Sequence, residues 1–263
     1  MGSVEAQGGE RYAVVTGANK GIGFELVRQL ACRGVVVVLT ARDEKRGREA
    51  ASKLRDDHHL HANVIFHQLD VLDPLSIQSL ANFIHDSFGR LDILVNNAGA
   101  SGVVVVEEDL KALNIDPTSW LSGQAVNKVQ EALLPLLKLS TGGARIVNVS
   151  SLRSELKRIP SEEIRNELGN VEALTEEKVD AILRRFLHDF KENALEANGW
   201  TMMLPAYSIS KQTLNAYTRI LAKKYPKMYI NCVHPGFVLS SWLFYQMEDL
   251  QAAISIKTQL ADF

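Results

Sequence analysis

The stretch Tyr12–Gly23, YAVVTGANKGIG, decides the fold that we expect for this chain. It opens with a short apolar run of the kind that a buried parallel strand shows. A turn with three glycines follows, and behind the turn comes an apolar-periodic helix. Glycine lets backbone N–H groups come close to a pyrophosphate at a helix N-terminus, where the helix dipole favours negative charge. Because a strand precedes this turn and a helix follows it, the stretch predicts a dinucleotide site.

Length and composition favour an ordinary α/β protein. The chain has 263 residues, a net charge of −2 and 46% hydrophobic residues, so neither nucleic acid nor an anionic membrane is indicated as a partner. Two cysteines, Cys32 and Cys232, stand 200 positions apart, which is typical of a reducing compartment. The N-terminal residues show no apolar core of a signal peptide. We therefore expect a cytoplasmic location.

Strands and helices alternate from the glycine turn onward. Apolar runs predict further strands at 35–39, 64–68, 91–95, 145–149 and 230–233. Helices are expected from a cap at Asp43 to about Asp57, from Pro74 to Phe88, and in a segment that closes at Leu133–Leu139. This order predicts a Rossmann-type, doubly wound parallel sheet of about six to seven strands, with ligands at the carboxyl ends of its strands.

The alternation of strands and helices is interrupted at 152–204, which we interpret as a helical insertion. Apolar residues recur there at helical spacing, at Val179, Ile182, Leu183, Phe186, Leu187 and Phe190. The insertion either covers one side of the active cleft or is a packing element without substrate contacts, and the sequence leaves both open. We expect one domain over residues 1–263, in which 241–263 form a short, atypical tail.

Two polar groups suggest proton chemistry. Tyr207 and Lys211 stand four positions apart in YSISK, so their side chains share one face of a helix. A free phenol has a pKa of about 10, and a nearby ammonium favours the phenolate and lowers that pKa. Such a pair can donate a proton to a carbonyl oxygen or take one from an alcohol. Ser150 and Ser151 in NVSS can hydrogen-bond the same oxygen, or can be plain turn residues.

The motifs TGANKGIG, NNAG, NVSS, YxxxK and PG occur in that order, and together they resemble the short-chain dehydrogenase/reductase family over most of residues 11–240. The stretches NKGIGFE, FHQLDV and LDILVNNAG, with NGW before Tyr207, are similar to a plant subgroup of carbonyl reductases. That subgroup includes the salutaridine, menthone and neomenthol reductases. The chain looks shortened against this pattern.

The resemblance implies a role for each motif. Tyr207 would be the general acid, Lys211 would tune it and hold the nicotinamide ribose, and Ser151 would be the catalytic serine. Asp70 and Val71 would flank the adenine, and the insertion would leave the protein a monomer. The implied cofactor-binding residues are Gly17, Asn19, Lys20, Gly21, Ile22, Gly23, Arg42, Asp70, Val71, Asn97, Ala98, Gly99, Tyr207, Lys211, Pro235, Gly236 and Val238.

The end of the second strand indicates which cofactor binds. An NAD site has a carboxylate there for the ribose 2′-hydroxyl. This chain instead has Thr40 and Ala41, followed by Arg42, and Lys20 stands in the glycine turn. Two cations without an acid suit a 2′-phosphate, so we expect NADP(H). Asp43 is better explained as a helix cap.

The function expected from these residues is reduction of an apolar ketone, terpenoid-like or cyclic, in a pocket lined by Trp200, Met202, Leu204 and Phe237. No metal site is expected, because His58, His59 and His61 lie in a charged, solvated stretch without cysteine. No G-x-S-x-G elbow of a hydrolase is present.

Two departures from the family pattern keep alternatives open. Ser122, Gly123 and Gln124 stand where the family has a catalytic asparagine, and Asn127 would need a shifted register. Only 27 residues follow Gly236. One alternative is therefore a shortened, catalytically impaired variant that still binds nucleotide. The other is an interaction protein whose apolar tail and exposed core edges join a partner or a homodimer.

Overall fold

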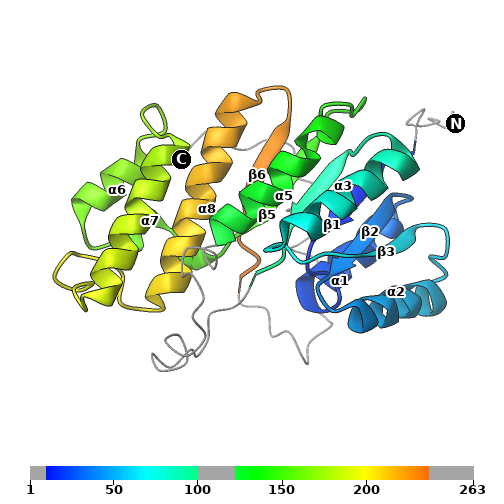
Figure 1. Cartoon of the computed structure of the whole chain (residues 1–263), viewed down its shortest axis with the longest axis horizontal. Coiled ribbons are helices and arrows are strands. Elements are labelled where there is room, and N and C mark those ends of the chain that lie inside the picture. The colour runs from blue at the N-terminus through cyan, green and yellow to red at the C-terminus, as the bar shows by residue number, and fades with distance from the viewer. Residues whose placement is uncertain (1–9, 100–121, 237–263) are drawn as a thin grey trace, which may run out of the picture.

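A six-stranded parallel sheet runs through the molecule in the order β3-β2-β1-β4-β5-β6 (Figure 1). The computed structural model describes residues 10–99 and 122–236. The strands are β1 (Tyr12–Val15), β2 (Val36–Ala41), β3 (Val64–Gln68), β4 (Ile93–Asn96), β5 (Arg145–Val149) and β6 (Tyr229–Val233). Each predicted strand overlaps one of them, and the predicted Rossmann-type, doubly wound fold is confirmed. The predicted tail at 241–263 lies outside the described residues.

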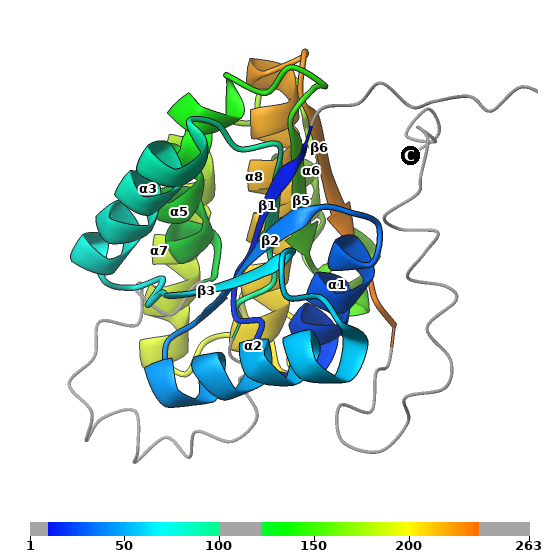
Figure 2. The ribbon, with the colours of Figure 1, turned by 90° about the vertical axis from the view of Figure 1, so that its right-hand side faces the viewer.

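Helices cover both faces of the sheet, as Figure 2 shows. On one face lie α1 (Gly21–Ala31) and α2 (Glu44–His58), and on the other lie α3 (Pro74–Phe88), α5 (Ser122–Leu137) and α8 (Pro205–Lys224). Asp43 and Asp73 cap α2 and α3 through side-chain oxygens that accept backbone N–H bonds. Among the described residues, no helix has the length and apolar character needed to cross a membrane.

The strand order reverses between β1 and β4, and this reversal places the candidate site. The chain moves outward from β1 to β2 and β3, then returns to pair β4 with the other side of β1, with Val15 opposite Val95. In such sheets ligands bind in the crevice at the carboxyl ends of the strands, where neighbouring connections run in opposite directions. The glycine turn after β1 and the loop after β4 both stand at this point.

Strand β2 extends two residues beyond the predicted run. All six of its residues are buried, because helices cover the sheet on both faces. The polar residue in this extension, Thr40, is accommodated since its hydroxyl donates to the Val15 carbonyl oxygen at 3.1 Å. An apolar-run criterion stops at Leu39, although the backbone pairing continues to Ala41.

The insertion packs against the outer side of α8. It contains the short 3₁₀ turns η2 (Leu152–Ser154) and η3 (Leu156–Arg158) and the helices α6 (Glu162–Gly169) and α7 (Glu176–Lys191). Most of the apolar face predicted for α7 builds a separate buried cluster with Ile209, Ala216 and Tyr217 of α8, whereas Phe190 at its end is exposed. The part of the insertion that contains α6 and α7 is thus a packing element on α8.

Trp200 corrects the expected substrate pocket. Its side chain is 2% exposed, belongs to the cluster between the insertion and α8, and donates from Nε1 to Asp189 Oδ2 at 2.8 Å. The prediction that Trp200 lines the pocket was therefore wrong, because this aromatic ring is used to anchor α7. Phe237, the other aromatic residue predicted there, lies outside the described residues.

Candidate functional site

The glycine turn is pressed against the loop that follows β4. Gly17 and Gly21 have φ of +63° and +61°, which residues with a side chain rarely adopt. A Cβ on Gly17 would lie 2.8 Å from the Ala98 Cα, and one on Gly23 would lie 2.5 Å from the Asn97 Nδ2. These contacts leave no room for a side chain, so glycine is needed at 17 and 23 for the fold of the turn itself.

Asn97 and Thr16 hold these two segments together. The Asn97 side chain donates from Nδ2 to the carbonyl oxygens of Thr16 (2.9 Å) and Gly17 (3.0 Å). The Thr16 hydroxyl oxygen accepts from the backbone N–H groups of Asn97 (3.0 Å) and Ala98 (2.9 Å). The Asn97 amide nitrogen is therefore used to shape the turn, whereas sequence reasoning placed this residue only as part of the cofactor channel.

Two exposed cations stand beside this turn. Lys20 is the residue before α1, and Arg42 follows β2; within 10–99 and 122–236 neither side chain forms an ion pair. The Arg42 backbone is held, since its carbonyl oxygen accepts from Gln68 Nε2 at 3.2 Å. Asp43 accepts from the Arg46 backbone N–H at 2.9 Å. The prediction that Asp43 is a helix cap is confirmed.

Other residues predicted to bind the cofactor also follow strands. Asp70 comes two positions after β3, and its Oδ1 accepts from the Leu72 N–H at 3.0 Å, while Val71 packs against the core under α3. Pro235 and Gly236 follow β6, and Gly236 has φ +74°. Of the remaining predicted contacts, Asn19 is half-buried in the glycine turn, and Ile22 in the first turn of α1 packs on the core. Val238 lies outside the described residues.

Lys211 is a residue of α8, and its side chain extends from this helix to the end of β5. Its Nζ is 5.8 Å from the centre of the Tyr207 ring and donates to the Val149 carbonyl oxygen at 2.9 Å. A Cβ on Gly99 would lie 3.7 Å from the same nitrogen. The lysine is 8% exposed, and its burial lowers its pKa from 10.5 to about 8. The predicted pairing of Tyr207 with Lys211 is present. The Lys211 ammonium lies where α8, β5 and the loop after β4 meet.

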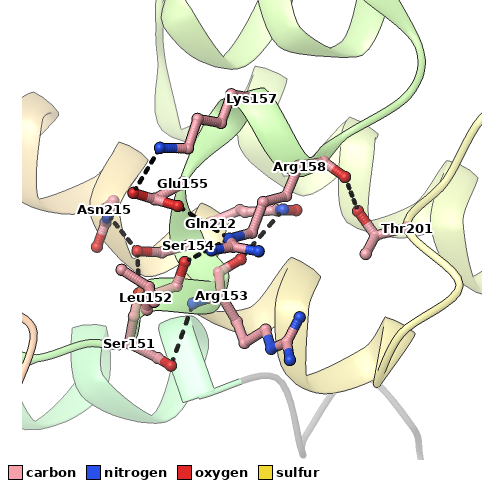
Figure 3. A network of polar contacts seen from close by, with 10 residues as sticks. All are labelled: Ser151, Leu152, Arg153, Ser154, Glu155, Lys157, Arg158, Thr201, Gln212 and Asn215. Carbon is pink, nitrogen blue, oxygen red and sulfur yellow. Dashed lines mark hydrogen bonds and ion pairs between the residues drawn. The ribbon is translucent and has the colours of Figure 1, made fainter. Parts of the chain in front are cut away.

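The two serines after β5 have different surroundings. Ser150 is buried, and its hydroxyl donates to Asn215 Oδ1 at 2.7 Å. Ser151 is half-buried, and its Oγ accepts from the Arg153 N–H at 3.2 Å as the cap of η2 (Figure 3). In the described part of the chain the Ser151 hydroxyl proton has no acceptor. Of the two serines, only Ser151 thus keeps its hydroxyl proton uncommitted within the described residues.

Sequence reasoning missed a buried polar network that supports this region. Asn148 Oδ1 accepts from Asn96 Nδ2 (2.8 Å) and from Gln130 Nε2 (3.1 Å), and Asn148 Nδ2 donates to Thr218 Oγ1 (2.9 Å). These residues come from β4, β5, α5 and α8, and Asn96 is the register partner of Asn148. The available signal was an asparagine next to apolar residues in each of two strand segments, after Val95 and after Val147.

The remaining candidates from the sequence are the residues at the expected asparagine position and the histidines near the end of α2. Ser122, Gly123 and Gln124 form the first turn of α5, so a helix does begin where the family asparagine was expected. His58 ends α2, and His59 takes a left-handed backbone at φ +55° as the residue that terminates the helix. Among the described residues, no group of three metal-ligating side chains occurs.

The comparisons with known proteins agree with this arrangement. The family model for short chain dehydrogenases matches residues 11–161. The chain belongs to this family. Our chain is 51% identical to a relative from Saponaria officinalis named "Short-chain dehydrogenase/reductase 1", and the match covers 87% of our chain and 82% of the relative. It is 46% identical to a (+)-neomenthol dehydrogenase of Arabidopsis thaliana, over 89% and 85% of the two chains.

A solved structure supports the same conclusion. Salutaridine reductase from Papaver somniferum superposes with a TM-score of 0.79 at 45% identity, and the match covers 88% of each chain. The predicted membership of the plant subgroup is confirmed by these relatives. The short-chain dehydrogenase is an oxidoreductase, and its family uses NAD(P).

Proposed function

We propose that this short-chain dehydrogenase is an NADPH-dependent carbonyl reductase that acts on an apolar ketone, terpenoid-like or cyclic. The observation that carries the proposal is that Lys211 lies over the Tyr207 ring and bonds to Val149 at the end of β5, while the turn that Ser151 caps is bonded to the same helix, α8. The relatives support it, since their names describe enzymes of a terpenoid alcohol and of an alkaloid.

The side chains divide the chemistry between them. NADPH supplies the hydride when it is bound. Tyr207 donates its phenolic proton to the carbonyl oxygen, so that the ketone gains one hydride and one proton and leaves as the alcohol. Ser151 donates a hydrogen bond to the same oxygen while negative charge develops there. The Lys211 ammonium, held by the Val149 carbonyl oxygen, stabilises the phenolate that remains on Tyr207.

The cofactor fits the residues beside β1 and β2. Close packing at Gly17 and Gly23 keeps a turn free of side chains at the start of α1, as a pyrophosphate requires. Lys20 and Arg42 are exposed cations beside that turn, and the nearest acid, Asp43, is engaged in capping α2. We infer that Arg42 and Lys20 hold the 2′-phosphate of NADP(H).

The substrate class follows from the residues before α8. Met202, Met203 and Leu204 are 54%, 57% and 42% exposed and directly precede the first turn of the helix that carries Tyr207. Flexible methionines adapt to irregular apolar surfaces. An apolar ring system packed on these side chains would lie beside the proton donor.

A tyrosine pair tests the proposal. Tyr207→Phe should reduce NADPH oxidation with a panel of cyclic ketones by about 10²- to 10⁴-fold and leave the NADPH dissociation constant unchanged. Tyr229→Phe is the matched control, because Tyr229 is half-exposed on β6 and contacts Arg145 through its ring face. Unchanged turnover in Tyr207→Phe would refute the role of Tyr207. Tight NADPH binding by the unmodified protein without turnover of any ketone would overturn the proposed reductase activity.

We further propose a single-domain monomer in the cytoplasm. The apolar face of the insertion packs against α8, so it is not available to a second copy of the chain. Both cysteines are free thiols, which fits a reducing compartment. Elution at about twice the mass of one chain in size-exclusion chromatography would contradict the monomer, and secretion of a tagged chain would contradict the location.

A further inference from the structure

Asn215 continues the line of reactive residues along α8. Tyr207, Lys211 and Asn215 are four positions apart, so they share one helix face. Asn215 is half-buried and faces the η2 turn that carries Ser151, and Figure 3 shows its amide directed at Ser154.

The Asn215 amide bonds to a serine on each side of Ser151. Its Oδ1 accepts from the Ser150 hydroxyl at 2.7 Å, and its Nδ2 donates to Ser154 Oγ at 2.8 Å. Ser154 in turn donates to the Ser151 carbonyl oxygen at 2.5 Å. Ser154 is 2% exposed, so these bonds are shielded from water.

The direction of each bond makes an amide necessary. The single protons of Ser150 and Ser154 are both donated, one to Asn215 and one to the Ser151 backbone. The residue at 215 must therefore accept at one atom and donate at the other. A carboxylate only accepts, so it would draw the Ser154 proton away from Ser151.

The opposite side of the turn is held from the insertion. Arg158 Nε donates to the Leu152 carbonyl oxygen at 3.0 Å and to Glu155 Oε2 at 2.9 Å. The turn thus has one support from η3 and one from the helix of the proton donor (Figure 3).

We propose that Asn215 is a positioning residue, which fixes Ser151 relative to Tyr207 so that both hydroxyls address one carbonyl oxygen. The proposal rests on the proposed reductase function. Asn215 contacts neither substrate nor cofactor in this role; it acts through the turn of Ser151.

A double-mutant cycle tests the coupling. Ser151→Ala should lower kcat by about 10²- to 10³-fold, as does loss of one donor to a developing oxyanion. Asn215→Ala and Asn215→Asp should each lower kcat by about 10- to 100-fold with an unchanged NADPH dissociation constant, because misplacement of about 1 Å has such an effect. In the Ser151→Ala background, either Asn215 substitution should cause no further loss.

Two further variants separate positioning from stability. Tyr217→Phe removes the hydrogen bond from the same helix to Asp180 and should lower stability without changing kcat. Ser154→Ala cuts the link at its other end and should reproduce the Asn215→Ala effect, including its dependence on Ser151, should Asn215→Ala not fold.

The outcomes are distinct. Losses that multiply in the double variant, or full kcat in the folded Asn215 and Ser154 variants, would overturn the positioning role. If Ser151→Ala and Tyr207→Phe themselves leave turnover unchanged, the proposed function fails, independently of Asn215.

Discussion

The buried ammonium of Lys211 should make the stability of the apo protein depend on pH in a defined way. Burial lowers the lysine pKa to about 8, against 10.5 in the unfolded chain. Between these values the unfolded chain binds the proton and the folded chain does not. The free energy of unfolding therefore rises with pH, because the penalty of burying the charge is relieved as the folded lysine loses its proton.

The magnitude follows from the same two pKa values. Integrated from pH 7 to pH 9.5, the difference in proton binding increases the free energy of unfolding by about 2 kcal/mol. Lys211→Met keeps an unbranched apolar side chain and removes the titrating group, so it should lack this increase. Groups common to both proteins, such as Cys232, whose pKa is raised by burial, cancel in the comparison.

Urea unfolding followed by circular dichroism at several pH values supplies the measurement. The free energy of unfolding of the unmodified protein minus that of Lys211→Met should rise by about 2 kcal/mol from pH 7 to pH 9.5. A difference that stays flat over this range would refute the reasoning, since it would mean that the folded and unfolded chains hold the lysine proton equally.

Three further predictions concern the frame of the site. Gly23→Ala places a Cβ 2.5 Å from Asn97 Nδ2 and should lower the free energy of unfolding by about 1–3 kcal/mol and weaken NADPH binding; unchanged NADPH titration would contradict it. Trp200→Phe leaves Asp189 without its indole donor and should cost about 1–3 kcal/mol in thermal unfolding, with turnover per folded molecule unchanged; lost turnover would restore Trp200 to the pocket. Asp43→Ala removes a helix cap worth about 1 kcal/mol and should leave the ratio of NADPH to NADH affinity unaltered, whereas an altered ratio would place Asp43 in the cofactor site.

The sequence predicted the fold well because the sheet is covered on both faces. A strand buried on both sides shows as a continuous apolar run, and β3 and β5 have the bounds that such runs predicted. Helix α3 also begins at Pro74 and ends at Phe88 as predicted, since proline and glycine mark its ends. In contrast, α5 ends at Leu137, two residues before the predicted Leu139, where apolar character continues after the backbone has left the helix.

The candidate site residues can be named from local sequence patterns, but the hydrogen bonds that hold them cannot. Tyr207 and Lys211 are recognisable by spacing, because one helix brings them together. The bonds from Asn97 to the glycine turn and from Asn215 to Ser150 span 80 and 65 positions. No local pattern reveals such pairs. Trp200 was misplaced for the related reason that an apolar side chain suits a pocket and a core equally well.

Helix α8 has a further property that matters for engineering. One of its faces carries Tyr207 and Lys211, while Ile209, Ala216 and Tyr217 on another are buried in the cluster built by the insertion. Exchanging α6 and α7 between members of the family should therefore shift the position of α8, and Tyr207 and Lys211 with it. If the proposed function holds, changes in the apolar packing of this interface should shift Tyr207 without altering Met202, Met203 or Leu204, whereas loss of one hydroxyl, as in Tyr217→Phe, leaves that packing in place.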